Sequence, residues 1–122
     1  SIWRTQSDYD RLLPMLDSKV IGWTPDVGHM AYTDMNPVEM MRDHRALVNH
    51  GHYKDMHKDK SWALMGEGTV DFKTLTQDLV DTDYEGWIIV EDECERSVNE
   101  PDQVTIECGE YTENVLRPIA KG

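Results

Sequence analysis

Three short apolar segments, set between stretches with helical periodicity, constrain the fold of this chain more than any other feature. They span residues 20–26, 47–53 and 87–91, and each is too short to be a core helix. The last contains WIIV, four consecutive apolar residues before a glutamate, which is typical of a strand buried on both faces of a parallel sheet. The pattern predicts strands that alternate with helices, and therefore parallel βα units of an α/β fold.

Four helices are expected around these strands. Side chains that can cap a helix precede the first three, at Ser7, Asn36 and Asp71. Pro101 opens the fourth, at a position where its missing N–H is tolerated. Apolar residues then recur at helical spacing, most clearly over residues 72–79. The predicted order is helix, strand, helix, strand, helix, strand, helix.

The composition limits the number of domains and the kinds of partner. With 122 residues, the chain is expected to form a single domain over residues 1–122, without an internal linker. Its 24 acidic and 12 basic residues give a formal net charge of -12. The field of such a chain repels phosphate backbones and anionic lipid surfaces, so we expect neither a nucleic-acid nor a membrane partner.

The apolar content and the cysteines bear on the compartment. No stretch approaches the roughly 18 apolar residues of a membrane span, and the start of the chain lacks the apolar core of a signal peptide. A cytoplasmic location is therefore expected. Cys94 and Cys108 are too few for a disulfide framework, although they can still form one bridge. In the cytoplasm, we expect them to be free thiols.

Polar residues that can bind a ligand or take part in catalysis stand at the end of each predicted strand. Asp26 and His29 follow the first strand. His52 and Lys54 close the second, and Glu91 ends the third. Ligands of parallel sheets and (β/α)8 barrels bind at the carboxyl ends of the strands, so these side chains are expected to converge on one rim.

An aspartate, a histidine and a glutamate from neighbouring strands can form a divalent-metal site. Carboxylate oxygens suit manganese or magnesium, and an imidazole also admits zinc, cobalt or iron. A metal there can polarise a carbonyl or hydroxyl oxygen while a carboxylate moves the proton. This is the chemistry of sugar isomerisation, epimerisation and dehydration.

Structural roles stay open beside these functional ones. Asp26 can be a turn former or a helix cap, and His29 an ordinary loop histidine. Lys54 and Asp55 can be a solvated pair at the start of the long connection over residues 55–68. A connection of that length is more often functional than a tight turn.

Four segments, in this order and spacing, resemble the C-terminal part of the xylose-isomerase-like TIM-barrel family. They are VIGWTPDVGHM, VNHGHYKD, GEGTVDFKTL and YEGWIIVEDE. That family includes sugar epimerases, hydroxypyruvate isomerase, inosose dehydratase and a metal-dependent endonuclease. The resemblance implies that the chain is the C-terminal three-strand portion of a (β/α)8 TIM barrel.

The resemblance also implies roles for individual residues. Asp26, His52 and Glu91 would be the metal ligands, and Glu91 would in addition handle the proton. His29 would contact the substrate or the metal and is the second catalytic candidate. Lys54 would be a substrate-side group.

One departure from the family pattern bears on the substrate. The DNA-cutting members carry an Asp-x-His pair just before the Gly-x-Gly turn, where this chain has Lys60 and Trp62. Together with the net charge of -12, this disfavours a nuclease and leaves a sugar or polyol. Trp62 can supply an apolar wall against a sugar ring, or it can simply pack its loop down.

These arguments favour a divalent-metal-dependent sugar or polyol isomerase or epimerase, with manganese expected first and magnesium, cobalt or zinc as alternatives. A dehydratase or lyase acting on a keto-sugar or keto-inositol would use the same residues. A complete barrel needs about 250 residues and eight strands. The chain is therefore expected to be a fragment completed by an N-terminal half-barrel, either a missing segment or another chain. Association into a homo-oligomer is a further alternative. A non-catalytic half-barrel subunit is the third alternative.

Overall fold

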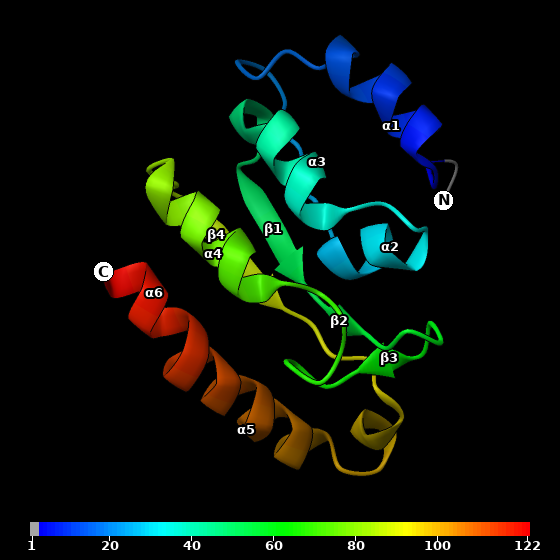
Figure 1. Ribbon diagram of the computed structural model, residues 1–122, viewed down its shortest axis with the longest axis vertical. Helices are drawn as coiled ribbons and strands as arrows, with labels where there is room; N and C mark the ends of the chain where they lie inside the picture. The colour runs from blue at the N-terminus through cyan, green and yellow to red at the C-terminus, as the bar shows by residue number, and fades with distance from the viewer. Residues whose placement is uncertain (1–2) are drawn as a thin grey trace.

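A pair of parallel strands forms the centre of the computed structural model, which describes residues 3–122 (Figure 1). Strand β1 (His50–Tyr53) pairs with β4 (Trp87–Val90), with His50 opposite Trp87 and Tyr53 opposite Val90. Parallel neighbours require a long crossover connection, and α4 provides its helix here. The second and third predicted strands are therefore present in the predicted orientation.

The prediction of a first strand over residues 20–26 is only partly correct. The chain joins the free edge of β1 through single parallel bridges, Trp23 to Val48 and Asp26 to His52. Val20 and Ile21 are 82% and 53% exposed, because their N–H groups donate to Asp17 in a turn. An extended conformation next to β1 therefore begins only near Trp23.

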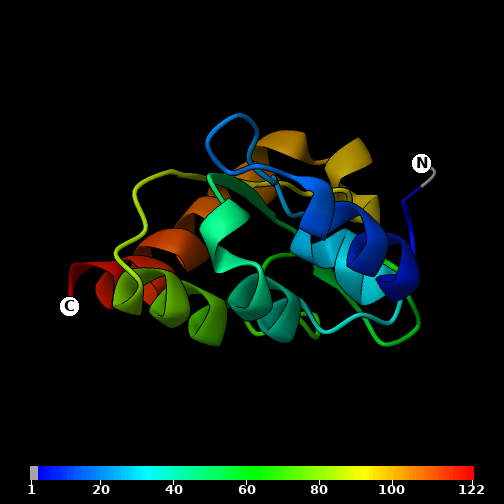
Figure 2. The same ribbon diagram turned by 90° about the horizontal axis from the view of Figure 1, so that it is seen from above.

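The described part of the chain contains six α-helices, and α1 and α6 lie on opposite sides of the molecule in Figure 2. Their bounds are Gln6–Leu12 (α1), Val27–Tyr32 (α2), Pro37–Asp43 (α3), Phe72–Asp81 (α4), Pro101–Tyr111 (α5) and Arg117–Lys121 (α6). Short 3-10 turns occupy Leu13–Met15, Arg45–Leu47 and Glu95–Val98, and a π-helical turn, Thr112–Leu116, joins α5 to α6. Compared with the predicted order, the structure has an additional helix, α2, which follows Asp26 directly.

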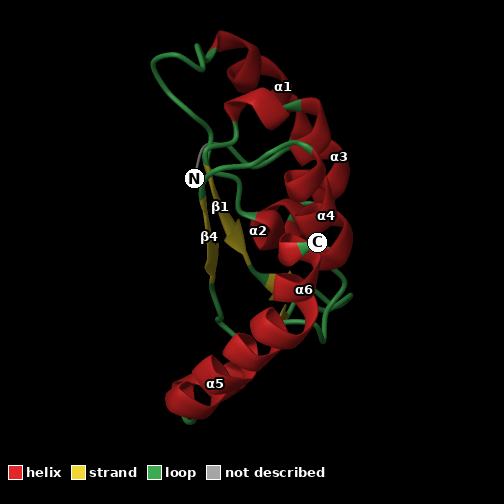
Figure 3. Cartoon of the chain, turned by 90° about the vertical axis from the view of Figure 1, so that its left-hand side faces the viewer, coloured by secondary structure: helices red, strands yellow, loops and turns green. Residues whose placement is uncertain are grey.

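The described helices cover one face of the strands, as Figure 3 shows from the side. On that face Tyr53 is buried, and Ile88 and Val90 pack against the core. On the other face Trp87 is 74% exposed and Ile89 39% exposed. The prediction of strands buried on both faces is therefore wrong for β4 in this chain. The reason is that side chains alternate along a strand, so helices on one side bury only every second residue.

Local capping chemistry explains where several helices begin. Asn36 and Asp71 cap α3 and α4 as predicted, each accepting backbone N–H bonds from the first turn. Ser7 is not the cap of α1, because Thr5 and Asp8 form a reciprocal capping box two residues earlier. The box satisfies two backbone donors at once, which a cap at Ser7 would leave unpaired.

The connection that follows β1 is more ordered than its polar sequence indicates. It contains a small antiparallel ladder between β2 (Asp55–Met56) and β3 (Trp62–Ala63). Cys94 and Cys108 are both buried and free, as predicted. No helix in the described range combines the length and apolar character needed to cross a bilayer.

Replacing the cap of α4 tests this account of helix formation. We expect Asp71→Ala to lower the free energy of unfolding by about 1 kcal/mol, because the N–H of Thr74 loses its acceptor. The matched control is Asp81→Ala at the opposite end of α4, expected to stay within about 0.5 kcal/mol of the wild type. Urea unfolding followed by circular dichroism measures both.

The cap should also depend on pH in one direction. Hydrogen bonds from the backbone and side chain of Thr74 hold the pKa of Asp71 below its ordinary value of 3.8. A depressed folded-state pKa stabilises the protein above the unfolded-state pKa, and this stability is lost as the pH falls through the folded-state value. The difference between wild type and Asp71→Ala should therefore be full at neutral pH and shrink below pH 3.8. A difference that grows on acidification would contradict the capping role.

Candidate functional site

Three potential metal ligands meet at the carboxyl ends of the parallel segments. Asp26, His52 and Glu91 each offer one ligand atom, and these atoms lie within 4.8 Å of one another. His52 Nδ1 is 3.0 Å from Glu91 Oε1. All three residues are half-buried. The structure therefore brings together the three residues to which the sequence assigns metal binding, and we call them the triad.

Asp26 serves its helix and the triad at the same time. It is the N-cap of α2, and its Oδ1 accepts the backbone N–H of His29 at 2.9 Å. Its other oxygen, Oδ2, lies 3.8 Å from Nε2 of His29. A carboxylate has two oxygens, so the capping and ligand interpretations of Asp26 are compatible.

Strand register places the other two members of the triad. His52 lies opposite Ile89 in the ladder, and the N–H of Glu91 donates to the carbonyl of Tyr53 at 2.9 Å just beyond it. Alternation along each strand then turns His52 and Glu91 to the same face. His50 lies on that face as well, with its ring 5.6 Å from that of His52, but it is not a member of the triad.

Lys54 and Asp55 are both 1% exposed, so the interpretation as a solvated pair is wrong. Lys54 Nζ lies 2.7 Å from Glu93 Oε1 and 4.2 Å from the centroid of the Trp62 ring. The ion pair with Glu93 is close but not aligned as a hydrogen bond, and Nζ has no hydrogen-bond acceptor among the described residues. A buried ammonium is costly unless it is paired, and the Glu93 carboxylate and the Trp62 ring are the partners that offset this cost.

Trp62 lies between the two basic candidates. Its ring contacts that of His29 edge-on, with 5.1 Å between centroids, and that of Tyr32 at 5.7 Å. Lys54 lies over the same indole. His29 itself keeps a side chain that is 59% exposed. Trp62 therefore packs the connection against α2, and in doing so it touches both residues that the sequence places on the substrate side.

A cavity of about 510 Å³ borders Asp26, one member of the triad. Asp26 and His29 form part of its wall, together with the aromatic rings of Tyr9 and Tyr32. Burial, with a smaller contribution from the charge of Asp26, raises the pKa of Tyr9 above 10.0. Small-molecule sites are commonly about 300–1,000 Å³, lined by rings and a few polar groups. This cavity is therefore a candidate substrate site.

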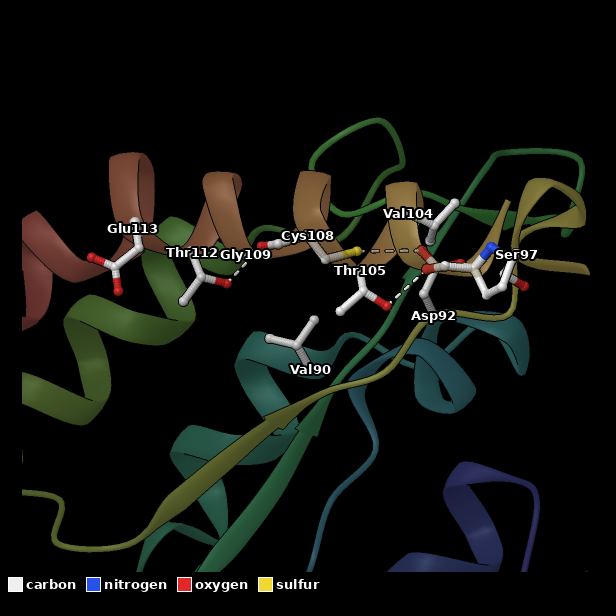
Figure 4. A pocket seen from close by; sticks show the side chains of 10 residues that line it. Val90, Asp92, Ser97, Val104, Thr105, Cys108, Gly109, Thr112 and Glu113 are labelled. Carbon is white, nitrogen blue, oxygen red and sulfur yellow. Dashed lines mark hydrogen bonds between the residues drawn. The ribbon is translucent and has the colours of Figure 1, made fainter. Parts of the chain in front are cut away.

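A larger cavity, about 630 Å³, lies elsewhere, between the end of β4 and α5 (Figure 4). Figure 4 shows Cys108 directed at Asp92, and the Sγ to Oδ2 distance is 3.6 Å. No member of the triad lines this cavity. Proximity to the triad, rather than size, identifies the candidate substrate site.

Sequence reasoning missed Glu93, Tyr9 and Tyr32. Glu93 could have been found, because it follows Glu91 by two residues and so shares its face. The tyrosines gave no such signal, because their position depends on how α1 and α2 pack beside Asp26.

Comparison with known proteins identifies the family. Residues 1–112 match the model of the family described as xylose isomerase-like TIM barrel. The chain belongs to this family. Inosose dehydratase of Clostridium botulinum (strain Eklund 17B / Type B) is 25% identical over 126 residues, covering 88% of this chain and 42% of that protein. Inosose dehydratase of Lactiplantibacillus plantarum is 29% identical over 116 residues, covering 80% of this chain and 39% of that protein.

Solved structures agree on the fold. A D-tagatose 3-epimerase-like protein superposes with a TM-score of 0.60 and 26% identity, covering 90% of this chain and 42% of the other. An IolI protein with a bound zinc atom superposes with a TM-score of 0.74 at 14% identity, covering 95% of this chain and 45% of the other. The chain spans about two fifths of the length of these relatives. The predictions of family and of a partial TIM barrel are therefore confirmed.

The two thiols offer a test of the packing between β4 and α5. Burial raises the pKa of Cys108 to about 11, and it also raises that of Cys94 above 9.0. At pH 8 the thiolate fraction of Cys108 should be roughly a hundredfold lower in the folded chain than in urea. We therefore expect a disulfide reagent to label the folded Cys94→Ala variant at least that much more slowly than the unfolded variant. A folded rate within a few-fold of the unfolded rate would contradict this packing.

Proposed function

We propose that this chain forms the metal-binding and proton-transfer part of a divalent-metal-dependent sugar or polyol isomerase, epimerase or dehydratase. The convergence of Asp26, His52 and Glu91 within 4.8 Å carries this proposal. The relatives named as inosose dehydratases, and a neighbour named as D-tagatose 3-epimerase-like, support the reaction class. The activity is proposed for the whole barrel, of which residues 1–122 are one part.

The donor set fits a divalent cation. Two ligands about 2.1 Å from one ion are separated by roughly 3 Å, and His52 Nδ1 and Glu91 Oε1 are 3.0 Å apart. Two carboxylates and an imidazole suit manganese first, with magnesium, cobalt and zinc as alternatives. The zinc of the IolI structure supports a metal in this fold. Once bound, the cation would polarise a carbonyl or hydroxyl oxygen of the substrate.

Glu91 and His29 are the proposed proton-transfer residues. Glu91 would take a proton from the carbon next to the carbonyl with the oxygen that does not face the cation. His29 is largely exposed and lies beside Asp26 on the wall of the 510 Å³ cavity, where it can hold or return a proton at a substrate oxygen. Return of the proton to carbon completes an epimerisation or isomerisation. In a dehydration, a neighbouring hydroxyl leaves as water.

Lys54, His29 and Trp62 are the proposed substrate-binding residues. The ammonium of Lys54 is buried and has no aligned acceptor among the described residues, so it can donate to an oxygen of a bound sugar. Trp62 supplies an apolar surface between Lys54 and His29. A polyol ring offers apolar C–H faces and hydroxyl acceptors, which suit this combination.

Dehydration is the second candidate reaction, favoured by the names of the curated relatives. We further propose that residues 1–122 form one unit completed by a complementary N-terminal half-barrel, in a longer chain or a second one. The face of β4 that carries Trp87 and Ile89 is exposed, and in a complete barrel that face would be interior. A subunit without catalytic activity is the alternative if turnover fails in the complete assembly.

Loss of a triad residue should abolish metal binding selectively. We expect His52→Ala to weaken Mn²⁺ or Zn²⁺ binding by at least roughly a hundredfold, since changes to outer partners alone cost ten- to a hundredfold. His50→Ala, on the same strand and face, is the matched control and should bind like the wild type. Calorimetric titration of the metal-stripped protein measures both. Equal affinity in wild type and His52→Ala would refute the triad as the metal site.

Turnover in deuterated buffer separates the reaction classes. The complete protein, loaded with Mn²⁺, should incorporate deuterium into a ketose at the carbon next to the carbonyl, or convert a keto-inositol with loss of water. Glu91→Gln should lower kcat by about a hundredfold or more, as expected for loss of a general base. Metal binding without turnover of either substrate class would favour the non-catalytic subunit.

A further inference from the structure

Asp55 is a buried carboxylate that the proposed chemistry does not use. It is 1% exposed, and it accepts backbone N–H bonds from four residues of its own connection. The donors are Met56 at 2.8 Å, Gly66 at 3.0 Å, Gly68 at 2.9 Å and Val70 at 3.2 Å. Hydrogen bonds to a charged acceptor are stronger than neutral ones, so this carboxylate holds both ends of the loop over residues 56–70 together.

The glycines of the loop fit around this carboxylate. A Cβ at Gly68 would lie 2.2 Å from Asp55 Oδ1, closer than any real contact. Gly66 has a φ of +88°, in the left-handed region that glycine adopts without strain. The Gly-x-Gly turn is therefore shaped so that two N–H groups reach Oδ2 of Asp55.

The same loop carries Trp62 to the rim of the site. In the β2–β3 ladder Asp55 lies opposite Ala63, and Met56 lies opposite Trp62. Trp62 then contacts Lys54 on one side and His29 on the other. A displacement of the Asp55 end of the ladder would therefore move the indole away from both residues.

The outer contact of the loop is much weaker. Lys60 Nζ lies 2.8 Å from Asp34 Oδ2 on α2's C-terminal side, but the two side chains are 41% and 79% exposed. Exposed ion pairs contribute little, because solvent screens them and both side chains lose freedom. Asp34 has a φ of 63°, which asparagine also tolerates. Asp34→Asn is therefore a matched control for a change at Asp55.

We propose that Asp55 is a positioning residue of the active site, which fixes Trp62 between Lys54 and His29 through the loop of residues 56–70. The inference deepens the proposed function and rests on it only for its kinetic consequence. The structural part, that Asp55 sets the position of Trp62, can be tested without any activity.

The first test follows the indole N–H resonance of Trp62, assigned by its loss in Trp62→Phe. Asp55→Asn replaces an acceptor oxygen by an NH2 group that faces backbone N–H donors, so the resonance should shift or broaden. The resonance of Trp23 should stay in place, because its ring packs against Tyr9 and His44. Asp34→Asn should leave the indole resonances of both Trp62 and Trp23 unchanged. A folded Asp55→Asn protein with a native Trp62 resonance would overturn the proposal.

A measurement on the unmodified protein covers the case in which Asp55→Asn does not fold. The amides of Gly66, Gly68 and Val70 donate to the buried carboxylate, so they should exchange with deuterated water far more slowly than that of Lys58 at the loop tip. Exchange of the three amides as fast as that of Lys58 would overturn the proposal.

A double-mutant cycle in the complete enzyme tests the kinetic part. Asp55→Asn and Trp62→Phe should each raise KM by roughly tenfold with a smaller change in kcat, and the double variant should be no worse than either one. Additive effects would overturn the action of Asp55 through Trp62. A displaced Trp62 resonance with unchanged KM in both variants would support the positioning role and refute the substrate contact of Trp62 instead.

Discussion

The parallel register between β1, β4 and the segment before α2 is the constraint on which the site depends. It sets Asp26 opposite His52, and it sets Glu91 two residues beyond Ile89, the partner of His52 in β4, so that the three ligand atoms lie within 4.8 Å. A slip of one residue would turn every side chain of a strand to the opposite face. The register is held by the helix-side face, where Tyr53 is buried and Ile88 and Val90 pack against the helices. Packing on one face thus positions the triad on the other.

The turn from β1 into β2 contains two consecutive buried charged residues with different partners. Lys54 and Asp55 are equally buried, but they are satisfied in different ways. Asp55 accepts four backbone N–H bonds and shapes its loop. Lys54 has an ion pair with Glu93 and contacts the face of Trp62, and its Nζ has no aligned hydrogen-bond acceptor among the described residues. Buried charges need partners, and here the backbone supplies them for one residue and side chains for the other.

Local sequence signals predicted much of the fold but not the exposure of its parts. Asn36 and Asp71 were identifiable as caps, because capping depends on a few adjacent residues. The run WIIV identified β4 correctly, yet Trp87 is 74% exposed, because burial depends on which elements cover each face. The solvated interpretation of Lys54 and Asp55 was wrong for a similar reason. Their polar character is visible in the sequence, but the loop that returns over them is not.

The sequence by itself determined the alternation of helices and strands, the family, and the residue types at the strand ends, because each depends on short patterns along the chain. Only the tertiary structure decided that Asp26, His52 and Glu91 share one place, that Glu93 and Trp62 flank Lys54, and that a cavity lined by Tyr9 and Tyr32 borders Asp26. Several of these contacts join residues far apart in the chain. Their distances follow from strand register and helix packing, which are properties of the whole fold and not of any local segment.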